Sequence, residues 1–123
     1  MNILAIDDNE DILKLLDTVV TGRGHNLTQV RNGKEGVKLI EEQNFDAVLL
    51  DLAMPEFSGL DVIESLKKSN HLKDQNIIIF TASSATDKVI AELLKNEGIS
   101  SCIRKPVKIK FLMKKIDEVV NSK

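Results

Sequence analysis

Five side chains that could handle a phosphoryl group stand at the ends of four short apolar runs. They are three carboxylates, one hydroxyl and one ammonium: Asp7, Asp8, Asp51, Thr81 and Lys105. If the runs are parallel strands of one sheet, all five side chains emerge at its carboxyl edge, where open α/β sheets bind ligands. The sequence therefore predicts that they meet in a single pocket.

The three carboxylates predict a metal site. Asp7, Asp8 and Asp51 would repel one another in a shared pocket, which raises the free energy of their fully ionised state. A divalent cation removes this conflict, and Mg²⁺ prefers oxygen ligands. Because neither Cys nor His adjoins these residues, Mg²⁺ or Mn²⁺ is expected rather than zinc.

Asp51 is the predicted nucleophile, because it stands alone at the end of the central run, which is apolar at every position. An aspartate can attack phosphorus and form an acyl phosphate. The transferred group spreads negative charge over three oxygens that the protein must position and neutralise. The metal would cover one oxygen, the Lys105 ammonium a second and the Thr81 hydroxyl a third.

The scaffold for these residues alternates apolar runs of strand length with segments of helical period. The expected strands lie near residues 3–6, 27–30, 47–50, 77–80 and 101–104. Such alternation predicts an α/β fold with a parallel sheet, right-handed crossovers and helices on both faces. The 123 residues suffice for one ordinary domain with a single core, and no linker or repeat divides them.

Each expected helix has an apolar face or a capping signal. In the first helix, the i, i+3, i+4, i+7 spacing predicts a buried face formed by Ile12, Leu15, Leu16 and Val19. In the fourth helix, the apolar residues are Val89, Ile90, Leu93 and Leu94. Asn32 and Ser58 are expected to cap the second and third helices, and residues 84–87 the fourth, which Gly98 would close.

The composition argues against several classes of protein. The net charge of −2 provides no field that favours nucleic acid or an anionic membrane. Without Trp and Tyr there is little surface on which bases could stack, so direct nucleic-acid binding is not expected. The first apolar run is too short for a signal peptide or a membrane span. The single cysteine, Cys102, permits no internal disulfide, which suits the cytoplasm.

Taken together and in this order, the motifs resemble the receiver domain of two-component response regulators. The resemblance covers residues 1–121 and leaves no second domain. It rests on Asp7-Asp8, on Asp51 with the Leu-Ala-Met-Pro-Glu-Phe-Ser-Gly segment that follows it, on Thr81-Ala82-Ser83 and on Lys105-Pro106. It implies a flavodoxin-like, doubly wound sheet of five parallel strands in the order 2-1-3-4-5, with five helices.

The resemblance also implies the chemistry of the acidic residues. Asp51 would accept a phosphoryl group from a phosphohistidine of a sensor histidine kinase or a histidine phosphotransfer protein. Asp8, Asp51 and the backbone carbonyl of Ala53 would bind Mg²⁺ (or Mn²⁺) directly. Asp7 would act largely through metal-bound water.

The resemblance assigns supporting roles to residues that follow the third, fourth and fifth strands. Thr81 and Lys105 would bind the phosphoryl oxygens, and a cis peptide before Pro106 would aim the lysine. Ala53 and Ser83 occupy the positions at which the family tunes hydrolysis of its own acyl phosphate. Neither residue is a strong base or an amide, so the lifetime of the acyl phosphate is left open.

One residue departs from the family pattern. Three residues before the lysine the family usually has Tyr or Phe, whose ring moves inward on activation, but here that residue is Cys102. A thiol buries easily and cannot act as a large rotor. We therefore expect activation to move Thr81 and the loop after it, to about Asp87, with little change at Cys102.

The expected function is that of a phosphorylation-dependent signalling switch. The chain would be a substrate that slowly dephosphorylates itself, not a dedicated enzyme. It would contact a downstream protein through its fourth helix, fifth strand and fifth helix. Three variants of this reading stay open: an intermediate of a phosphorelay, a phosphate sink, and a receiver fragment of a longer regulator.

Three other functions have specific signals against them. A small-molecule phosphatase that uses Asp as nucleophile usually has a second Asp two residues later, where this chain has Ala53. An interaction module that is never phosphorylated would not need the acids, Thr81 and Lys105. An FMN-binding domain shares the topology, but the acidic first loop at residues 7–10 would repel a phosphate that lacks a bridging metal.

Overall fold

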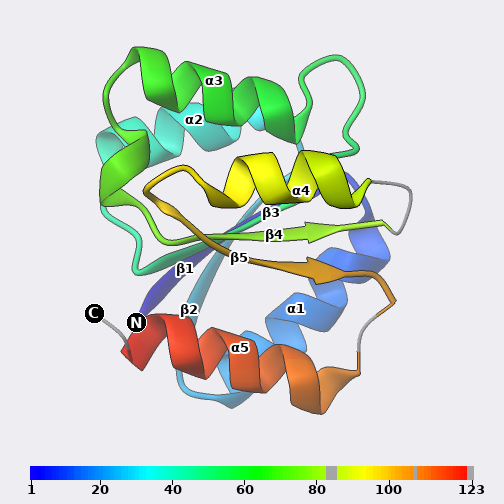
Figure 1. Cartoon of the computed structure of the whole chain (residues 1–123). Coiled ribbons are helices and arrows are strands. Elements are labelled where there is room, and N and C mark those ends of the chain that lie inside the picture. The colour runs from blue at the N-terminus through cyan, green and yellow to red at the C-terminus, as the bar shows by residue number, and fades with distance from the viewer. Residues whose placement is uncertain (83–85, 107, 122–123) are drawn as a thin grey trace.

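The structure is a computed structural model that describes residues 1–82, 86–106 and 108–121, with the side chains of residues 109, 119 and 120 left out. Strands and helices alternate along these residues (Figure 1). In chain order they are β1 (Asn2–Ile6), α1 (Glu10–Gly22), β2 (Asn26–Val30), α2 (Gly33–Glu42), β3 (Ala47–Leu50), α3 (Gly59–Lys68), the short 3-10 helix η1 (Leu72–Asp74), β4 (Ile77–Thr81), α4 (Asp87–Leu94), β5 (Ile99–Arg104) and α5 (Ile109–Asn121).

The strands form one parallel sheet in the order β2-β1-β3-β4-β5, which confirms the expected topology. Helices α2, α3 and α4 cover one face of the sheet, and α1 and α5 cover the other (Figure 1). The strand register places Leu50 beside Ile6 on one side and Ile79 on the other. The carboxyl ends of β1, β3 and β4 therefore lie next to one another.

The core is double, with one apolar layer on each face of the sheet. In β3 all four residues are buried, because helices cover both of its faces. Val48 and Leu50 pack on the side of α2, α3 and α4, whereas Ala47 and Leu49 pack on the side of α1 and α5. The edge strand β2 buries only Val30 completely, which agrees with its more polar sequence.

Two predicted caps are confirmed. The side chain of Asn32 accepts a hydrogen bond from the backbone N–H of Glu35 at 2.8 Å. The Ser58 hydroxyl accepts from the N–H of Asp61, whose carboxylate in turn accepts from the N–H of Ser58, so that the two form a capping box. Both helices therefore begin where the sequence indicates.

The predicted buried face of α1 is rotated by part of a turn. Its fully buried residues are Leu13, Leu16, Val19 and Val20. Ile12 and Leu15, which were expected in the core, are only half-buried and flank the layer on the α1 side of the sheet. The apolar residues of α1 cover a wider face than the i, i+3, i+4, i+7 spacing describes. Contact with the sheet decides which of them are buried.

Helix α4 packs less completely than its four apolar residues predict. Ile90 is buried, but Val89 and Leu94 are 39% and 40% exposed. The helix begins after Thr86, whose hydroxyl accepts from the N–H of Val89, and it ends at Leu94, not at Gly98. At eight residues it is the shortest of the five α-helices that the described residues form.

Gly98 has a different role from the predicted helix stop. It lies in the turn before β5 with a φ of +101°, a conformation that residues with a side chain rarely adopt. Its α-carbon faces the backbone of η1, where an added Cβ would overlap the carbonyl oxygen of Leu72. The Gly98 carbonyl accepts from the N–H of Ile77 at 2.8 Å, so this close approach joins the start of β4 to the turn.

Candidate metal and phosphoryl site

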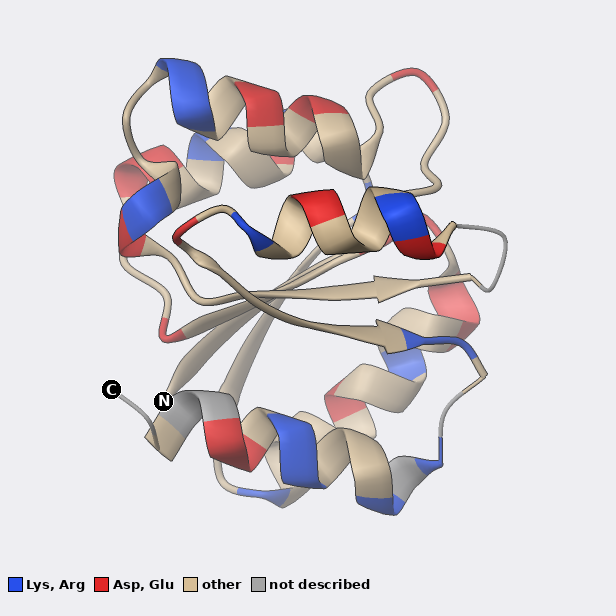
Figure 2. Ribbon diagram, viewed as in Figure 1, with Lys and Arg blue, Asp and Glu red and all other residues tan. Residues whose placement is uncertain are grey.

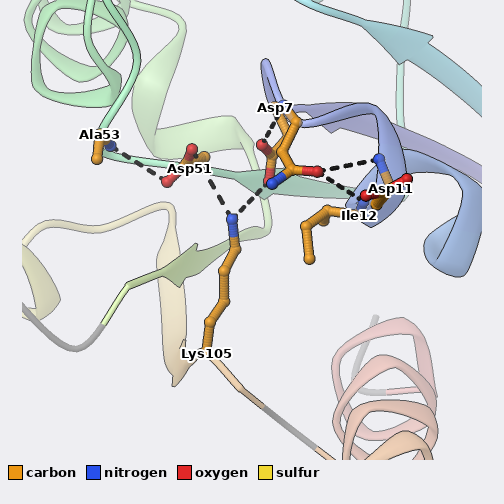
Figure 3. Close-up of polar contacts among 7 residues, drawn as sticks. Asp7, Asp11, Ile12, Asp51, Ala53 and Lys105 are labelled. Atoms are coloured by element: carbon orange, nitrogen blue, oxygen red, sulfur yellow. Dashed lines mark hydrogen bonds and ion pairs between the residues drawn. The ribbon is translucent and has the colours of Figure 1, made fainter.

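Four strand ends bring the predicted residues to one edge of the sheet. Asp7 and Asp8 follow β1, Asp51 follows β3, Thr81 ends β4, and Lys105 follows β5. Because the strands are parallel, these ends share the carboxyl edge. The close-up shows Asp7, Asp51 and Lys105 pointing toward one another (Figure 3).

The three carboxylates form a compact cluster. Asp7, Asp8 and Asp51 each offer one oxygen, and these oxygens lie within 4.8 Å of one another. Asp7 and Asp51 are 2% and 5% exposed, and Asp8 is more open to solvent. A set of oxygen donors with an open side fits Mg²⁺ or Mn²⁺, which bind a few carboxylates and keep several waters.

Lys105 lies against this cluster. Its Nζ is 2.8 Å from Oδ2 of Asp7 and 3.8 Å from Oδ2 of Asp51. The same ammonium lies over the Phe80 ring of β4, 5.2 Å from its centroid, and this cation–π contact helps to hold the lysine in place. The sequence placed Lys105 near the phosphoryl oxygens but gave no sign of its bond to Asp7, because β3 and β4 separate β1 from β5.

Asp7 has both carboxylate oxygens engaged. Oδ2 pairs with Lys105, and Oδ1 accepts a hydrogen bond from the N–H of Asn9 at 2.9 Å. The Asn9 side chain caps α1 by accepting from the N–H groups of Asp11 and Ile12 (Figure 3). Asn9 thus fixes the β1–α1 turn, a role that the sequence analysis missed although Asn is a common N-cap. With both oxygens occupied, Asp7 suits an indirect contact with a metal.

The carboxyl group of Asp51 is destabilised in its charged form. Burial raises its pKa, and the neighbouring carboxylates of Asp7 and Asp8 raise it further. The Lys105 ammonium and a hydrogen bond from the N–H of Ala53 to Oδ1, 3.1 Å long, act in the opposite direction. Since burial is the largest contribution, the net pKa lies above the usual value. A bound cation would relieve this cost.

Gly59 holds the segment that follows Asp51 in place. Its N–H donates to the carbonyl of Leu52 at 3.1 Å. A Cβ at this position would lie 2.7 Å from the Leu52 α-carbon and would also overlap the Asp51 carbonyl. Only glycine lets α3 start this close to the site, and the Ser58-Gly59 pair is the sequence signal that could have indicated it.

The remaining predicted residues lie around this centre. Thr81 is buried and pairs in register with Arg104, and its carbonyl accepts from the N–H of Lys105 at 2.7 Å. The Lys105–Pro106 peptide is cis, as the resemblance implied. Ser83, the predicted tuning residue, lies outside the described residues.

Cys102 is half-buried in β5 and packs against the layer beneath α4. Burial raises the pKa of its thiol, and the nearby Arg104 guanidinium offsets this only in part. A thiol that stays protonated is a poor nucleophile, so Cys102 has the character of a packing residue.

Comparison with known proteins agrees with the geometry. The sequence model of the response regulator receiver domain matches residues 3–117. The polar-differentiation response regulator DivK of Brucella anthropi is 31% identical over 108 residues, which cover 88% of this chain and 86% of DivK. The receiver domain of the Francisella response regulator 1452 has 27% identity and a TM-score of 0.84, covering 98% of this chain and 97% of that one.

A further relative is a larger protein, the CAI-1 autoinducer sensor kinase/phosphatase CqsS of Vibrio cholerae. It is 32% identical over 115 residues, which cover 93% of this chain but only 16% of CqsS. In the described part of the chain, no helix combines the length and the apolar character needed to cross a membrane. With its sheet order, its acidic cluster and this family match, the chain belongs to the response regulator receiver domain family of two-component signalling.

Proposed function

We propose that the chain is a phosphorylation-dependent signalling switch and that Asp51 is its phosphoryl acceptor. One observation carries this proposal: three carboxylate oxygens lie within 4.8 Å of one another, and the Lys105 ammonium contacts two of these carboxylates. Such a centre can gather a cation and a phosphoryl group around one carboxylate. Asp51 is the acceptor because it is buried and central, and because Asp7 already uses both oxygens.

The transfer is a displacement at phosphorus. An oxygen of Asp51 forms a bond to the phosphorus of a phosphohistidine, the P–N bond breaks, and the imidazole nitrogen that leaves takes up a proton. Lys105 pairs with one phosphoryl oxygen after its Nζ leaves Asp7, and the Thr81 hydroxyl donates to another. A Mg²⁺ held by Asp8, Asp51 and the carbonyl of Ala53 would supply positive charge to the phosphoryl oxygens.

Loss of the phosphoryl group by hydrolysis ends the activated state. Water attacks phosphorus, the bond to the Asp51 oxygen breaks, and inorganic phosphate leaves. Ala53 offers no side chain that could activate this water. We propose that the chain is a substrate that slowly dephosphorylates itself, not a dedicated enzyme. The same alanine stands where small-molecule phosphatases of this chemistry carry a second Asp.

The partners follow from the family. The donor is a sensor histidine kinase or a histidine phosphotransfer protein, and the relatives include a response regulator and a sensor kinase/phosphatase. The output is contact with another protein through the face formed by α4, β5 and α5, or transfer of the phosphoryl group onward as a relay or sink. We place this activity in the cytoplasm.

Acetyl phosphate tests the proposal without a partner. With Mg²⁺, intact-mass measurement should find one adduct of about 80 Da, the mass of one phosphoryl group. The adduct should disappear on treatment with base or hydroxylamine, as an acyl phosphate does, and should not form when EDTA removes the metal. An adduct that survives base, or one that forms equally well in EDTA, would point to a different residue or chemistry.

Asp8→Asn should weaken Mg²⁺ binding about tenfold or more, because it removes one charged ligand from the cluster. Calorimetric titration of the unphosphorylated protein measures this directly. Asp11→Asn is the matched control, since Asp11 lies three residues away at the start of α1 and is exposed. If both variants lost affinity equally, Asp8 would contribute only general charge and not ligation.

A further inference from the structure

We propose that an ion pair between Arg104 and Asp87 holds α4 against β5 in the unphosphorylated protein, and that the pair opens when the protein is activated. The first half concerns the resting protein alone. The second half rests on the proposed function, because it requires a phosphoryl group at Asp51. In a chain with Cys102 in place of the aromatic ring, this pair would be the movable contact.

The pair joins two elements at the edge of the site. Arg104 is the last residue of β5 and Asp87 is the first residue of α4, and the guanidinium donates to the carboxylate at 2.7 Å. Figure 2 shows basic residues at the tip of β5 and an acidic one at the facing end of α4. Arg104 is also the register partner of Thr81 and the neighbour of Lys105. A change at either residue therefore reaches the pair directly.

The Arg104 side chain contributes more than its charge. It is 34% exposed, so about two-thirds of its surface is covered, while the Asp87 side chain is fully exposed. The aliphatic stem of an arginine can cover apolar surface while its head stays in water. The pair therefore joins a largely covered side chain of β5 to a fully exposed side chain of α4.

Helix α4 has few other anchors. Among its described residues only Ile90 is buried, Leu93 is half-buried against the same core layer, and Val89 and Leu94 are 39% and 40% exposed. Elements with few buried apolar contacts open at low free-energy cost. One partly covered ion pair can therefore shift the position of this helix measurably, although it would matter little on a well-packed helix such as α1.

A groove separates α4 from the outer part of β5. It has a volume of about 480 Å³, and its lining includes Asp87, Ile90, Leu94, Cys102 and Arg104. The ion pair thus borders the groove, and the half-buried thiol lies within it. When α4 moves away from β5, access to Cys102 increases. Because this thiol is the only one in the chain, its labelling rate reports on the groove.

The experiment measures the rate at which a small thiol reagent labels Cys102 in the full chain. Asp87→Asn should raise the rate about two- to fivefold, the range expected for loss of one surface ion pair. Rates are compared after extrapolation to the fully ionised thiol, because the Arg104 charge lowers the thiol pKa. Glu92→Gln is the matched control: Glu92 is exposed and pairs with Lys95, which follows α4 directly, so the variant should be labelled at the wild-type rate.

A charge swap separates the pair from its individual residues. Arg104→Asp with Asp87→Arg should restore slow labelling, whereas each single change should speed it. If Asp87→Asn labels at the wild-type rate, the ion pair does not hold α4. If the swap stays as fast as the single changes, the residues act separately and the pair is not the cause.

Beryllofluoride with Mg²⁺, which imitates a bound phosphoryl group, tests the coupling to activation. It should speed labelling of the wild-type protein and add little to Asp87→Asn, whose helix is already released. If Asp51 becomes phosphorylated but beryllofluoride leaves the labelling rate unchanged, the coupling is wrong and the proposed function stands. If Asp51 accepts no phosphoryl group, the proposed function fails, and the Asp87→Asn result still decides whether the pair holds α4.

Discussion

Asp51→Asn should reduce phosphorylation by acetyl phosphate to background. The amide has nearly the size of the carboxylate, but it lacks the charge needed to attack phosphorus and to bind a cation. Neither of the other acids can replace it: Asp7 has both oxygens bonded, and Asp8 is more exposed than Asp51. Intact-mass spectrometry after incubation with Mg²⁺ and acetyl phosphate measures the loss.

Asp17→Asn is the control for this substitution. Asp17 lies on the exposed side of α1 and outside the acidic cluster, so its variant should be labelled like the wild type. Normal labelling of Asp51→Asn would identify another acceptor and would remove the basis of the proposed function.

Asp51→Asn should also be more stable than the wild type in the absence of metal. The pKa of Asp51 is raised in the folded protein, mainly by burial, so the native state binds this proton more tightly than the unfolded state does. The contribution of Asp51 to stability therefore falls as the pH rises from about the ordinary value of 3.8 to the raised pKa, and the penalty is complete above it. Asparagine has no such penalty.

Urea unfolding at several pH values measures this difference. The advantage of Asp51→Asn should be present at pH 7, shrink as the pH falls through that interval, and shrink also when Mg²⁺ is added to the wild type. An advantage that is the same at pH 3 and pH 7 would mean that the carboxylate charge is not its source.

Gly98→Ala should destabilise the fold by about 3 kcal/mol or more, since it combines backbone strain with overpacking. The φ of +101° is unfavourable for alanine, and its Cβ would overlap the Leu72 carbonyl oxygen of η1. The atoms nearest the added Cβ are all backbone atoms of Leu72 and Lys73, so no flexible side chain can move aside to make room. Thermal and urea unfolding of the purified variant measure the loss.

Gly22→Ala is the matched control. Gly22 is the last residue of α1, an added Cβ would meet nothing within 4 Å, and no positive φ is required there. Alanine at this position should leave stability unchanged or raise it by up to about 1 kcal/mol. Equal losses in the two variants would show that the contact with η1 is not the reason for the effect.

The sequence predicts the sheet and the site well, for a physical reason. Strands such as β3 are apolar throughout because both of their faces are covered. The first polar residue therefore marks the end of the strand clearly, as Asp7 does after β1 and Asp51 after β3. Parallel strands then bring those ends together without any information on helix packing. The clustering of the three acids could be predicted in this way and the two caps from local spacing, whereas the strand order followed from the resemblance to receiver domains.

Helix orientation and long-range pairing could not be predicted. In α1 two overlapping apolar faces compete, and only contact with the sheet selects Leu13 and Val20 over Ile12 and Leu15. In α4 the apolar spacing is regular, but Val89 remains 39% exposed. These outcomes depend on distances between elements, which no local pattern contains.

The pairs formed by side chains of the fifth strand and its end were missed for the same reason. Lys105 reaches Asp7 across the ends of two intervening strands, and Arg104 reaches Asp87 on a helix. Lys105 and Asp7 are separated by 98 positions in the chain, and Arg104 and Asp87 by 17 positions, so the spacing of these pairs carries no periodic signal.

The late position of Lys105 in the chain has a consequence for protein synthesis. A polypeptide emerging from the ribosome exposes Asp7, Asp8 and Asp51 well before β5 and the lysine that contacts two of these acids. Since domains form as units from the N-terminus onward, the incomplete chain has acids but no finished centre. Under the proposed function, a chain that has not yet reached β5 would therefore lack the lysine that completes the phosphoryl-accepting centre.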